Sequence, residues 1–440
     1  MTLLRIFAAA ALCLTLGAAH AAIPIQHWTH ASGARVYLVE SPAIPMLDVQ
    51  VNVDGGSRRD PASQAGLASV TAGLLTAGVA AQGGEPALDE NQLAEAWADL
   101  GASFDASAGA ERFSLSLRTL TRPDLLERAV ALAARQMGAP SWPDAVWQRD
   151  RQRLVAAWQE AQTRPATRAG RAFSEAVYGE HPLGREATPQ TLAAIDTAAM
   201  RDFYRAHVVA CRAQVSLVGA IDRAGAERIV GQLMAALAPH GCPALQAVPP
   251  VPALAAAVER RIPFDAAQAQ VLVGQPGVAR GDPDYFPLFV GNYILGGGGF
   301  VSRLTTEVRE KRGLSYSVYS YFAPGLQPGP FQLGLSTRPD QAEQALTVAR
   351  DVVTRFVAEG PTEAELQAAK DFLLNGFALR IDSNRKLLDN VANIAWHGLP
   401  LDYLDTWTAQ VQQVSTADIR RAFQRVLQPD RMVTVVLGAK

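Results

Sequence analysis

Two patterns of hydrophobic positions run along the first half of the chain. Strict alternation of apolar and polar residues predicts half-buried strands, whereas apolar residues three and four positions apart predict helices. The strands are mixed with runs of helices and do not alternate with them one by one, which favours an α+β fold. The predicted strands cover residues 35–40, 46–53, 102–107, 111–120 and 214–219, and the predicted helices include residues 63–76 and 89–100.

The second half repeats this order of elements. Residues 195–219, a helix followed by a strand, return at residues 414–438 with a constant offset of 219 positions and no gap. A repeat of this length indicates duplicated domains. Strands are predicted at residues 259–263, 269–275, 315–322 and 329–336, and helices at residues 285–295, 302–311 and within the block 340–427.

We therefore expect two homologous domains, each a mainly antiparallel sheet covered by helices on one side. The first domain covers residues 26–240 and the second residues 258–440. Between them, residues 241–257 hold four prolines among alanines, which predicts an extended linker that neither sheet can absorb.

The first residues have the pattern of a secretory signal peptide. Arg5 precedes an apolar run over residues 6–16, and small residues follow up to Ala21, so we expect a signal peptide at residues 1–21 with cleavage after Ala21 or Ala22. The apolar run is too short to cross a bilayer, which takes about 20 residues. The mature chain is expected to be soluble, without membrane contact, and secreted, most simply into a periplasm.

Composition narrows the class of partner. The 440 residues are 49% apolar and 19% charged, with a net charge of −2 and no basic stripe, which argues against a nucleic-acid partner. Two cysteines, Cys211 and Cys242, remain after the signal peptide. An oxidising compartment allows them to pair, but the sequence fits equally well with two small buried apolar side chains.

One segment of the first half resembles the metal-binding region of a peptidase family. Val-Asp-Gly-Gly-Ser-Arg at residues 53–58 and Ala-Gly-Leu-Ala at residues 65–68 are similar to the run that precedes His-x-x-Glu-His in insulinase/pitrilysin zinc peptidases. In that motif two histidines four positions apart hold zinc, and the glutamate is the general base. The matching positions here are Ser69, Ala72 and Gly73, which supply neither a metal ligand set nor a base.

The other candidate ligands do not restore a metal site. The family's additional glutamate ligand falls on Trp158 or Gln159, and a shift to Glu160 leaves a lone carboxylate. His27 and His30 are close together, but they precede the first predicted strand and have no acidic neighbour nearby in the sequence. His181 is better explained as a hydrogen-bonded loop residue. We expect no metal or other cofactor on this chain, and no catalysis by this chain alone.

The second half carries four consecutive glycines, Gly296, Gly297, Gly298 and Gly299, followed by Arg309 and Tyr316. On their own these residues fit a flexible loop, a solvated helix arginine before the helix stop at Gly313, and a core tyrosine at the start of a strand. The family resemblance changes this interpretation. An arginine followed seven positions later by a tyrosine, across a Gly-Leu-x-Tyr turn, resembles the family's second-domain substrate motif, and the glycines resemble a substrate-engaging loop.

The resemblance implies a division of labour between subunits. It identifies the chain as similar to a non-catalytic, substrate-binding subunit of a heterodimeric secreted zinc metalloendopeptidase, one half of a clam-shell that closes over peptides or unfolded polypeptides. A homologous partner subunit would then carry the zinc. The alternatives are a structural or peptide-holding assembly protein without a role in proteolysis, and a self-sufficient zinc peptidase with unusual ligands.

Overall fold

The computed structural model describes residues 23–237, 241–242 and 244–439. The expected signal peptide at residues 1–21 lies outside this range. Within it, no helix combines the length and the apolar character that a membrane span needs.

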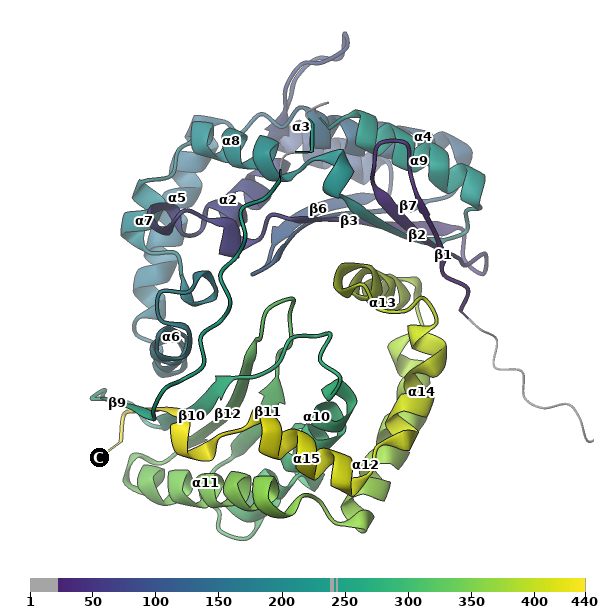
Figure 1. Cartoon of the computed structure of the whole chain (residues 1–440). Coiled ribbons are helices and arrows are strands. Elements are labelled where there is room, and N and C mark those ends of the chain that lie inside the picture. Colours follow the sequence, from purple (N-terminus) through teal and green to yellow (C-terminus); the bar gives the residue numbers. More distant parts are fainter. Residues whose placement is uncertain (1–22, 238–240, 243, 440) are drawn as a thin grey trace, which may run out of the picture.

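The described residues form two halves, each with one large sheet and a layer of helices on its outer side (Figure 1). The first sheet has the strand order β1-β2-β8-β3-β7-β6, and only the β2–β8 pair is parallel. Its strands are β1 (Gln26–Thr29), β2 (Arg35–Glu40), β3 (Met46–Asp54), β6 (Ser103–Ala108), β7 (Arg112–Leu120) and β8 (Gln214–Gly219).

The second sheet has the order β11-β12-β10-β13-β9, again with a single parallel pair, β13–β9. This is the order of the first sheet without β1. The expected α+β duplication is thereby confirmed. The strands are β9 (Val258–Ile262), β10 (Ala269–Pro276), β11 (Ser317–Phe322), β12 (Pro330–Thr337) and β13 (Val433–Leu437).

The outer face of each sheet and its helices enclose the main cores. In the first half, Val49 and Leu117 face each other across β3 and β7, and both lie in a core that includes residues of the outer helices. The second core is built the same way around Val271 and Leu335. The covering helices include α3 (Glu90–Asp99), α4 (Pro123–Gly138), α8 (Thr197–His207) and α9 (Arg223–Ala235) in the first half, and α10 (Tyr285–Asn292), α11 (Ala342–Glu359), α12 (Glu363–Asn375) and α15 (Thr416–Val426) in the second.

The two halves exchange a helix. Helix α6 (Pro165–Tyr178) belongs to the first half but packs on the inner face of the second sheet, where Phe173 and Val177 meet Leu272 and Val435. Helix α13 (Asn384–His397), exactly 219 positions later at both ends, packs its buried Val391 and Ile394 on the inner face of the first sheet (Figure 1). Neither sheet therefore completes its inner face with residues of its own half.

A half-buried carboxylate adds a polar contact between the halves. Glu111 of the first half accepts hydrogen bonds from the backbone N–H groups of Leu326 and Gln327, at 2.8 and 3.2 Å, and from Trp396 Nε1 at 3.2 Å. Arg58 pairs with the same carboxylate at 3.3 Å. Charge-assisted bonds of this kind are among the stronger protein hydrogen bonds, so Glu111 fixes the loop between β11 and β12 against α13.

A disulfide between Cys211 and Cys242 ties the turn before β8 to the start of the linker. This settles the alternative that the sequence left open. Residues 244–257 continue without regular secondary structure along the second half. His181, buried in its loop, contacts the carbonyl of Pro249 through Nε2 at 2.9 Å and holds the linker from the other side. The hydrogen-bonded loop role expected for His181 is confirmed.

Local structure departs from the sequence patterns at three places. The helix expected over residues 63–76 is broken into η2 (Ala62–Gln64), α2 (Leu67–Gly73) and η3 (Leu74–Thr76), with Gly66 at φ +103°. Strand β11 begins at Ser317, so Tyr316 precedes the strand that it was expected to start. Around the glycines and Arg309 the backbone forms π-helical turns, η6 (Tyr293–Gly297) and η8 (Thr305–Glu310).

Candidate functional site

Helix α2 holds the positions that match the family's metal motif. Ser69 and Gly73 are exposed on one face, and an added Cβ at Gly73 would meet open space. Ala72 lies in the interior, because it is only 1% exposed and belongs to the hydrophobic core of the first half. The position that corresponds to the general base is therefore part of the apolar interior in this chain.

A buried aspartate holds the start of α2. Asp60 is 3% exposed, and its carboxylate accepts hydrogen bonds from the backbone N–H groups of Gly66 and Ala68 at 2.8 and 2.9 Å. These bonds satisfy N–H groups that the first helical turn cannot pair internally. Burial raises the pKa of Asp60 to about 6, although the backbone hydrogen bonds oppose the shift. Asp60 thus positions the start of α2, and its carboxylate is used by these backbone hydrogen bonds and not presented on the exposed face of the helix.

Helix α5 (Asp144–Ala161) carries the positions matched to the additional ligand, and they are otherwise engaged or exposed. Trp158 lies under the guanidinium of Arg171, 5.1 Å from the ring centre. Gln159 is exposed, and Glu160 forms an ion pair with Arg164. No group of three or more His, Cys, Asp or Glu side chains suited to a metal ion occurs among the residues that the structure describes.

The histidine pair near the start of the chain has a structural role, and the expectation that both residues precede the first strand was wrong for His27. His27 lies within strand β1, where its Nδ1 contacts the carbonyl of Val36 at 2.9 Å. His30 has an acidic neighbour, because Glu227 of α9 lies 3.7 Å from its Nε2. The two residues are almost 200 positions apart, which is why the local sequence did not show the contact.

The second-half motif forms a compact stack on the surface. The Arg309 guanidinium lies 4.7 Å from the ring centre of Tyr316 and 4.7 Å from that of Phe300. Tyr316 is 79% exposed and Phe300 is 67% exposed. Gly313, at φ +61°, ends the helical segment by donating its N–H to the Arg309 carbonyl at 2.8 Å. The structure therefore brings Arg309 and Tyr316 into contact, with Arg309 half-buried and Tyr316 exposed.

The glycines divide into two pairs by their surroundings. Gly296 is buried, and a Cβ there would come within 2.6 Å of the Ser320 backbone nitrogen, so the missing side chain allows η6 to pack on β11. Gly298 donates its N–H to the Tyr293 carbonyl at 2.8 Å, which closes the π-helical turn. Gly297 and Gly299 are exposed, and Gly299 has φ +61° with open space beside it. Gly296 and Gly298 therefore belong to a packed turn, whereas Gly297 is exposed but close to Asn292, and Gly299 is exposed beside open space.

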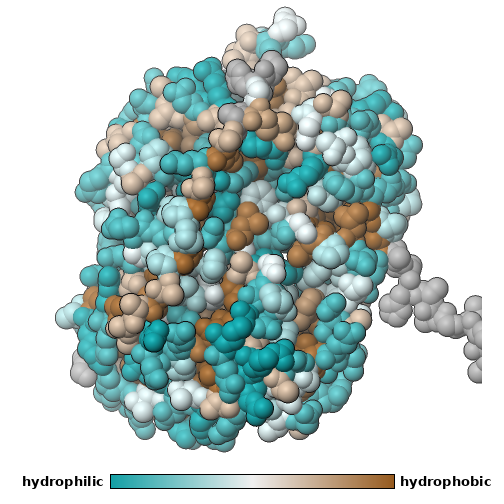
Figure 2. All heavy atoms as spheres, in the orientation of Figure 1, coloured by the Kyte–Doolittle hydropathy of each residue, from teal (hydrophilic) through white to brown (hydrophobic). Residues whose placement is uncertain are grey.

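An open groove of about 720 Å³ lies beside the exposed glycines. Gly297 and Gly299 form part of its wall, and β11 forms another part through Tyr319 and Tyr321, whose rings stack 6.1 Å apart. Hydrophobic residues also gather in the middle band of the molecule, where the two halves face each other (Figure 2). The rest of the lining includes five further aromatic residues, Tyr285, Phe289, Tyr293, Phe322 and Phe372.

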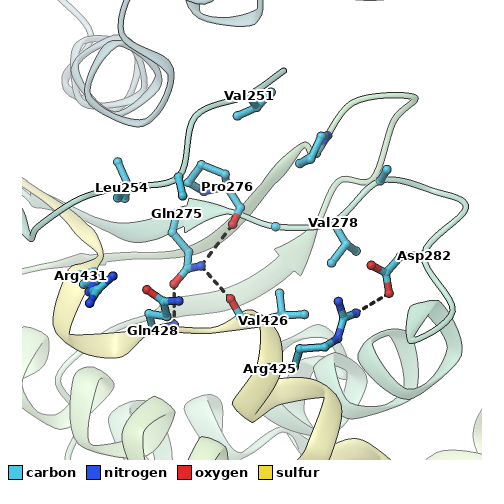
Figure 3. A pocket seen from close by; sticks show the side chains of 14 residues that line it. Val251, Leu254, Gln275, Pro276, Val278, Asp282, Arg425, Val426, Gln428 and Arg431 are labelled. Atoms are coloured by element: carbon cyan, nitrogen blue, oxygen red, sulfur yellow. Dashed lines mark hydrogen bonds and ion pairs between the residues drawn. The ribbon is translucent and has the colours of Figure 1, made fainter. Parts of the chain in front are cut away.

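A second pocket lies where the linker crosses the second half (Figure 3). Val251 and Leu254 of the linker cover it, and its volume is about 390 Å³. Of its two arginines, Arg425 and Arg431, Arg425 is paired with Asp282 and Asp284. Gln275 hydrogen-bonds to the backbone of Val426 and Gln428. Arg425 and Gln275 are therefore paired within the second half, and the apolar lining of the pocket includes the linker residues Val251 and Leu254.

Sequence reasoning missed Phe300. The residue directly follows the glycine run, and a large aromatic at the end of a run of glycines was the available signal. Its stacking on Arg309 depends on the turn between them and on two π-helical segments, which no apolar periodicity reveals. The aromatic groove was missed because its walls come from segments as far apart as residues 278 and 380.

The fold and this site together define a two-domain protein of peptidase type. Its helix α2 has Ser69, Ala72 and Gly73 at the positions where the metal motif has His, Glu and His. Residues 194–373 match the family model described as peptidase M16 inactive domain. The crystal structure of a peptidase M16 inactive domain from Pseudomonas fluorescens is 33% identical, with a TM-score of 0.88, and the match covers 95% of this chain and 98% of that one. The chain belongs to the peptidase M16 family, and the insulinase/pitrilysin resemblance is confirmed.

Two curated relatives carry contrasting names. An uncharacterized zinc protease from Streptomyces coelicolor is 32% identical over 266 residues, which cover 58% of this chain and 57% of the relative. A non-peptidase homolog from Helicobacter pylori is 33% identical over 135 residues, 29% of each chain. The similarity therefore spans little more than half of the first relative and less than a third of the second.

Proposed function

We propose that this chain is the non-catalytic, substrate-binding subunit of a heterodimeric zinc metalloendopeptidase that acts on peptides or unfolded polypeptides. One contrast carries the proposal. The surface stack of Phe300, Arg309 and Tyr316 is fully built, whereas the helix that carries Ser69 and Ala72 offers no metal ligand set. A chain with these features can hold a peptide but lacks the groups for metal-assisted hydrolysis.

The exposed stack has the chemistry to hold a peptide backbone. Arg309 carries five N–H donors and Tyr316 one O–H donor, and none of these groups can be saturated by the aromatic rings beside them. Both side chains can donate hydrogen bonds to a peptide carbonyl. Donors aimed at an oxygen that gains negative charge lower the barrier for hydrolysis. The zinc ion, which supplies the activated water in such enzymes, would be held by the homologous partner subunit.

The proposed compartment is extracytoplasmic, most simply the periplasm. The signal-peptide pattern at residues 1–21 supports this location. The disulfide between Cys211 and Cys242 supports it independently, because disulfides persist in oxidising compartments and are rare in the cytosol.

Reconstitution with a homologous subunit that carries His-x-x-Glu-His tests the proposal. The mixture is expected to hydrolyse an unfolded polypeptide, and Tyr316→Phe should lower turnover while the heterodimer still assembles, because only a hydroxyl on an exposed ring is lost. The readouts are the rate of peptide release and the heterodimer fraction by size-exclusion chromatography. Equal activity of the zinc subunit alone would contradict the proposal.

The same experiment separates the alternatives. Full proteolysis with Arg309→Ala in an intact heterodimer would favour a structural or peptide-holding role without a part in proteolysis. Hydrolysis by this chain alone, abolished by a chelator, would favour a self-sufficient zinc peptidase.

A further inference from the structure

The groove beside the glycine run begins next to the stack of Phe300, Arg309 and Tyr316. Its wall includes Gly299 and Ser317, which are the direct neighbours of Phe300 and Tyr316 in the chain. A peptide held on the stack would therefore continue along this groove. At about 720 Å³ the groove lies within the range of about 300–1,000 Å³ that ligand sites commonly have.

The lining of the groove suits a large apolar side chain. Phe372 is 62% exposed and stacks on Tyr293 with ring centres 5.1 Å apart. Tyr319 and Tyr321 of β11 are also unusually exposed for their size, at 40% and 37%. Aromatic rings at one site bind another ring by offset or edge-to-face contacts in addition to the burial of apolar area. Exposed aromatics gathered in a groove are typical of a binding surface.

One cation in the groove lacks an internal anion. The guanidinium of Arg380, in η10 (Phe377–Arg380), lies over the rings of Phe289 and Trp407, at 5.6 and 5.1 Å. Among the described residues no carboxylate forms an ion pair with it. In the linker pocket, by contrast, Arg425 is neutralised by two aspartates. The charge of Arg380 is therefore available to a ligand.

We propose that this groove is a side-chain subsite of the peptide-binding surface, and that it selects peptides with an aromatic residue next to a carboxylate. The aromatic side chain lies among Tyr293, Phe372 and the β11 tyrosines, and the carboxylate pairs with Arg380. The carboxylate can come from an acidic side chain or from the C-terminus of the peptide. This inference rests on the proposed peptide-binding function and adds a substrate class to it.

Binding of fluorescent peptides to the full-length mature chain tests the subsite without any partner. A flexible peptide with one central Phe-Glu pair is compared with versions that carry Ala-Glu or Phe-Gln, and a peptide that ends in Phe is made with a free and an amidated C-terminus. Fluorescence anisotropy gives the dissociation constants. The Phe-Glu peptide is expected to bind about five-fold more tightly than Ala-Glu and two- to five-fold more tightly than Phe-Gln. If amidation weakens binding and Glu→Gln does not, the C-terminus is the carboxylate that pairs with Arg380.

Variants link these preferences to the groove. Phe372→Ala should remove most of the preference for Phe over Ala, and Arg380→Gln should remove the preference for a carboxylate. Both side chains are exposed, so the fold should be kept. Leu154→Ala on α5 and Arg355→Gln on α11 are matched controls, because these exposed residues lie outside the groove.

The outcomes separate this inference from the proposed function. If all peptides bind equally and only Arg309→Ala weakens them, the subsite is wrong and the peptide-binding surface stands. If no peptide binds at millimolar concentration, the subsite and the proposed function both fail. Preferences that persist in Phe372→Ala and Arg380→Gln would also overturn the subsite.

Discussion

At the scale of single residues, Arg309 organises the exposed part of the second half. Its planar guanidinium fills the space between two exposed rings, Phe300 and Tyr316. A cation over an exposed ring contributes about 0.5–1 kcal/mol. Two such contacts favour one arrangement of both rings and the arginine, which would lower the entropy cost of binding a peptide under the proposed function.

Arg309→Lys tests whether this stack matters for binding. Lysine keeps the charge but loses the planar fork that stacks on both rings. Peptide affinity should fall two- to five-fold, measured by anisotropy, while the melting temperature stays unchanged. Arg312→Lys is the matched control, since Arg312 pairs with Glu307 outside the stack. Equal affinities for the two variants would show that charge alone suffices at position 309.

Asp60 gives a pH-dependent prediction. Its pKa is about 6 in the folded chain and 3.8 as the ordinary value. Between these values the folded chain binds more protons than the unfolded one, so this residue's contribution to stability falls as pH rises from 3.8 to 6. Relative to Asp60→Asn, which does not titrate, the parent should lose up to about 3 kcal/mol of stability between pH 4 and pH 7.

Urea unfolding at several pH values measures this difference, and the comparison between variant and parent is essential. Burial lowers the pKa of His397 to about 4 from 6.5, so His397 contributes stability that is lost as pH falls through that range. Its slope opposes that of Asp60, and subtraction removes it. Asp89→Asn, at the exposed cap of α3, controls for the change of a cap residue. A difference between parent and variant that does not vary with pH would contradict the account.

At the scale of elements, helix α2 divides the three positions that match the family's metal motif between the surface and the core. Ser69 and Gly73 are exposed, and an added Cβ at Gly73 would meet open space. Ala72 is packed in the first core, and the short helix passes directly into η3. Restoring the His-x-x-Glu-His motif would therefore require the core around position 72 to rearrange, in addition to three substitutions.

Single substitutions on α2 should show this asymmetry. Ala72→Glu places a carboxylate in an apolar core and should destabilise the chain by more than about 3 kcal/mol in urea unfolding. Ser69→His and Gly73→His should each change the stability by less than about 1 kcal/mol, because their side chains reach solvent. If Ala72→Glu left the stability unchanged, the side chain at position 72 would have to reach solvent, and its assignment to the core would be contradicted.

Element order was predictable, whereas local backbone geometry was not. Strands β7 and β12, which hold equivalent places in the two sheets, follow from alternating apolar and polar residues. The break at Gly66 depends on the side chain of Asp60, six positions earlier, and the π-helical turns depend on hydrogen bonds five residues apart. Neither the break at Gly66 nor the π-helical turns can be predicted from hydrophobic periodicity. The position of Tyr316 outside β11 follows from the same local detail.

At the scale of the whole molecule, the exchange of α6 and α13 makes the halves interdependent. Phe173 of α6 is 3% exposed, and a Cβ at Gly274 in the second sheet would lie 2.9 Å from the end of its ring. The sequence showed the duplication through the constant offset. It could not show the exchange, because amphipathic helices do not encode which of two similar sheets they cover.

Phe173→Ala should therefore destabilise the entire chain. Loss of a buried phenylalanine costs about 3–5 kcal/mol, and unfolding followed by circular dichroism and by tryptophan fluorescence should stay a single, coincident transition. Phe300→Ala, which removes an exposed ring and its contact with Arg309, is the control and should cost no more than about 1 kcal/mol. Two separate transitions, with the first half unaffected, would show that the halves fold independently.

We propose that this M16 chain has a peptide-binding surface and holds no zinc of its own. Native mass spectrometry of the isolated mature chain, with an unfolded peptide and an equimolar amount of zinc, reports both properties in one spectrum. The account predicts a peptide adduct that carries no stoichiometric zinc. One zinc ion per chain, or the absence of any peptide adduct, would contradict it.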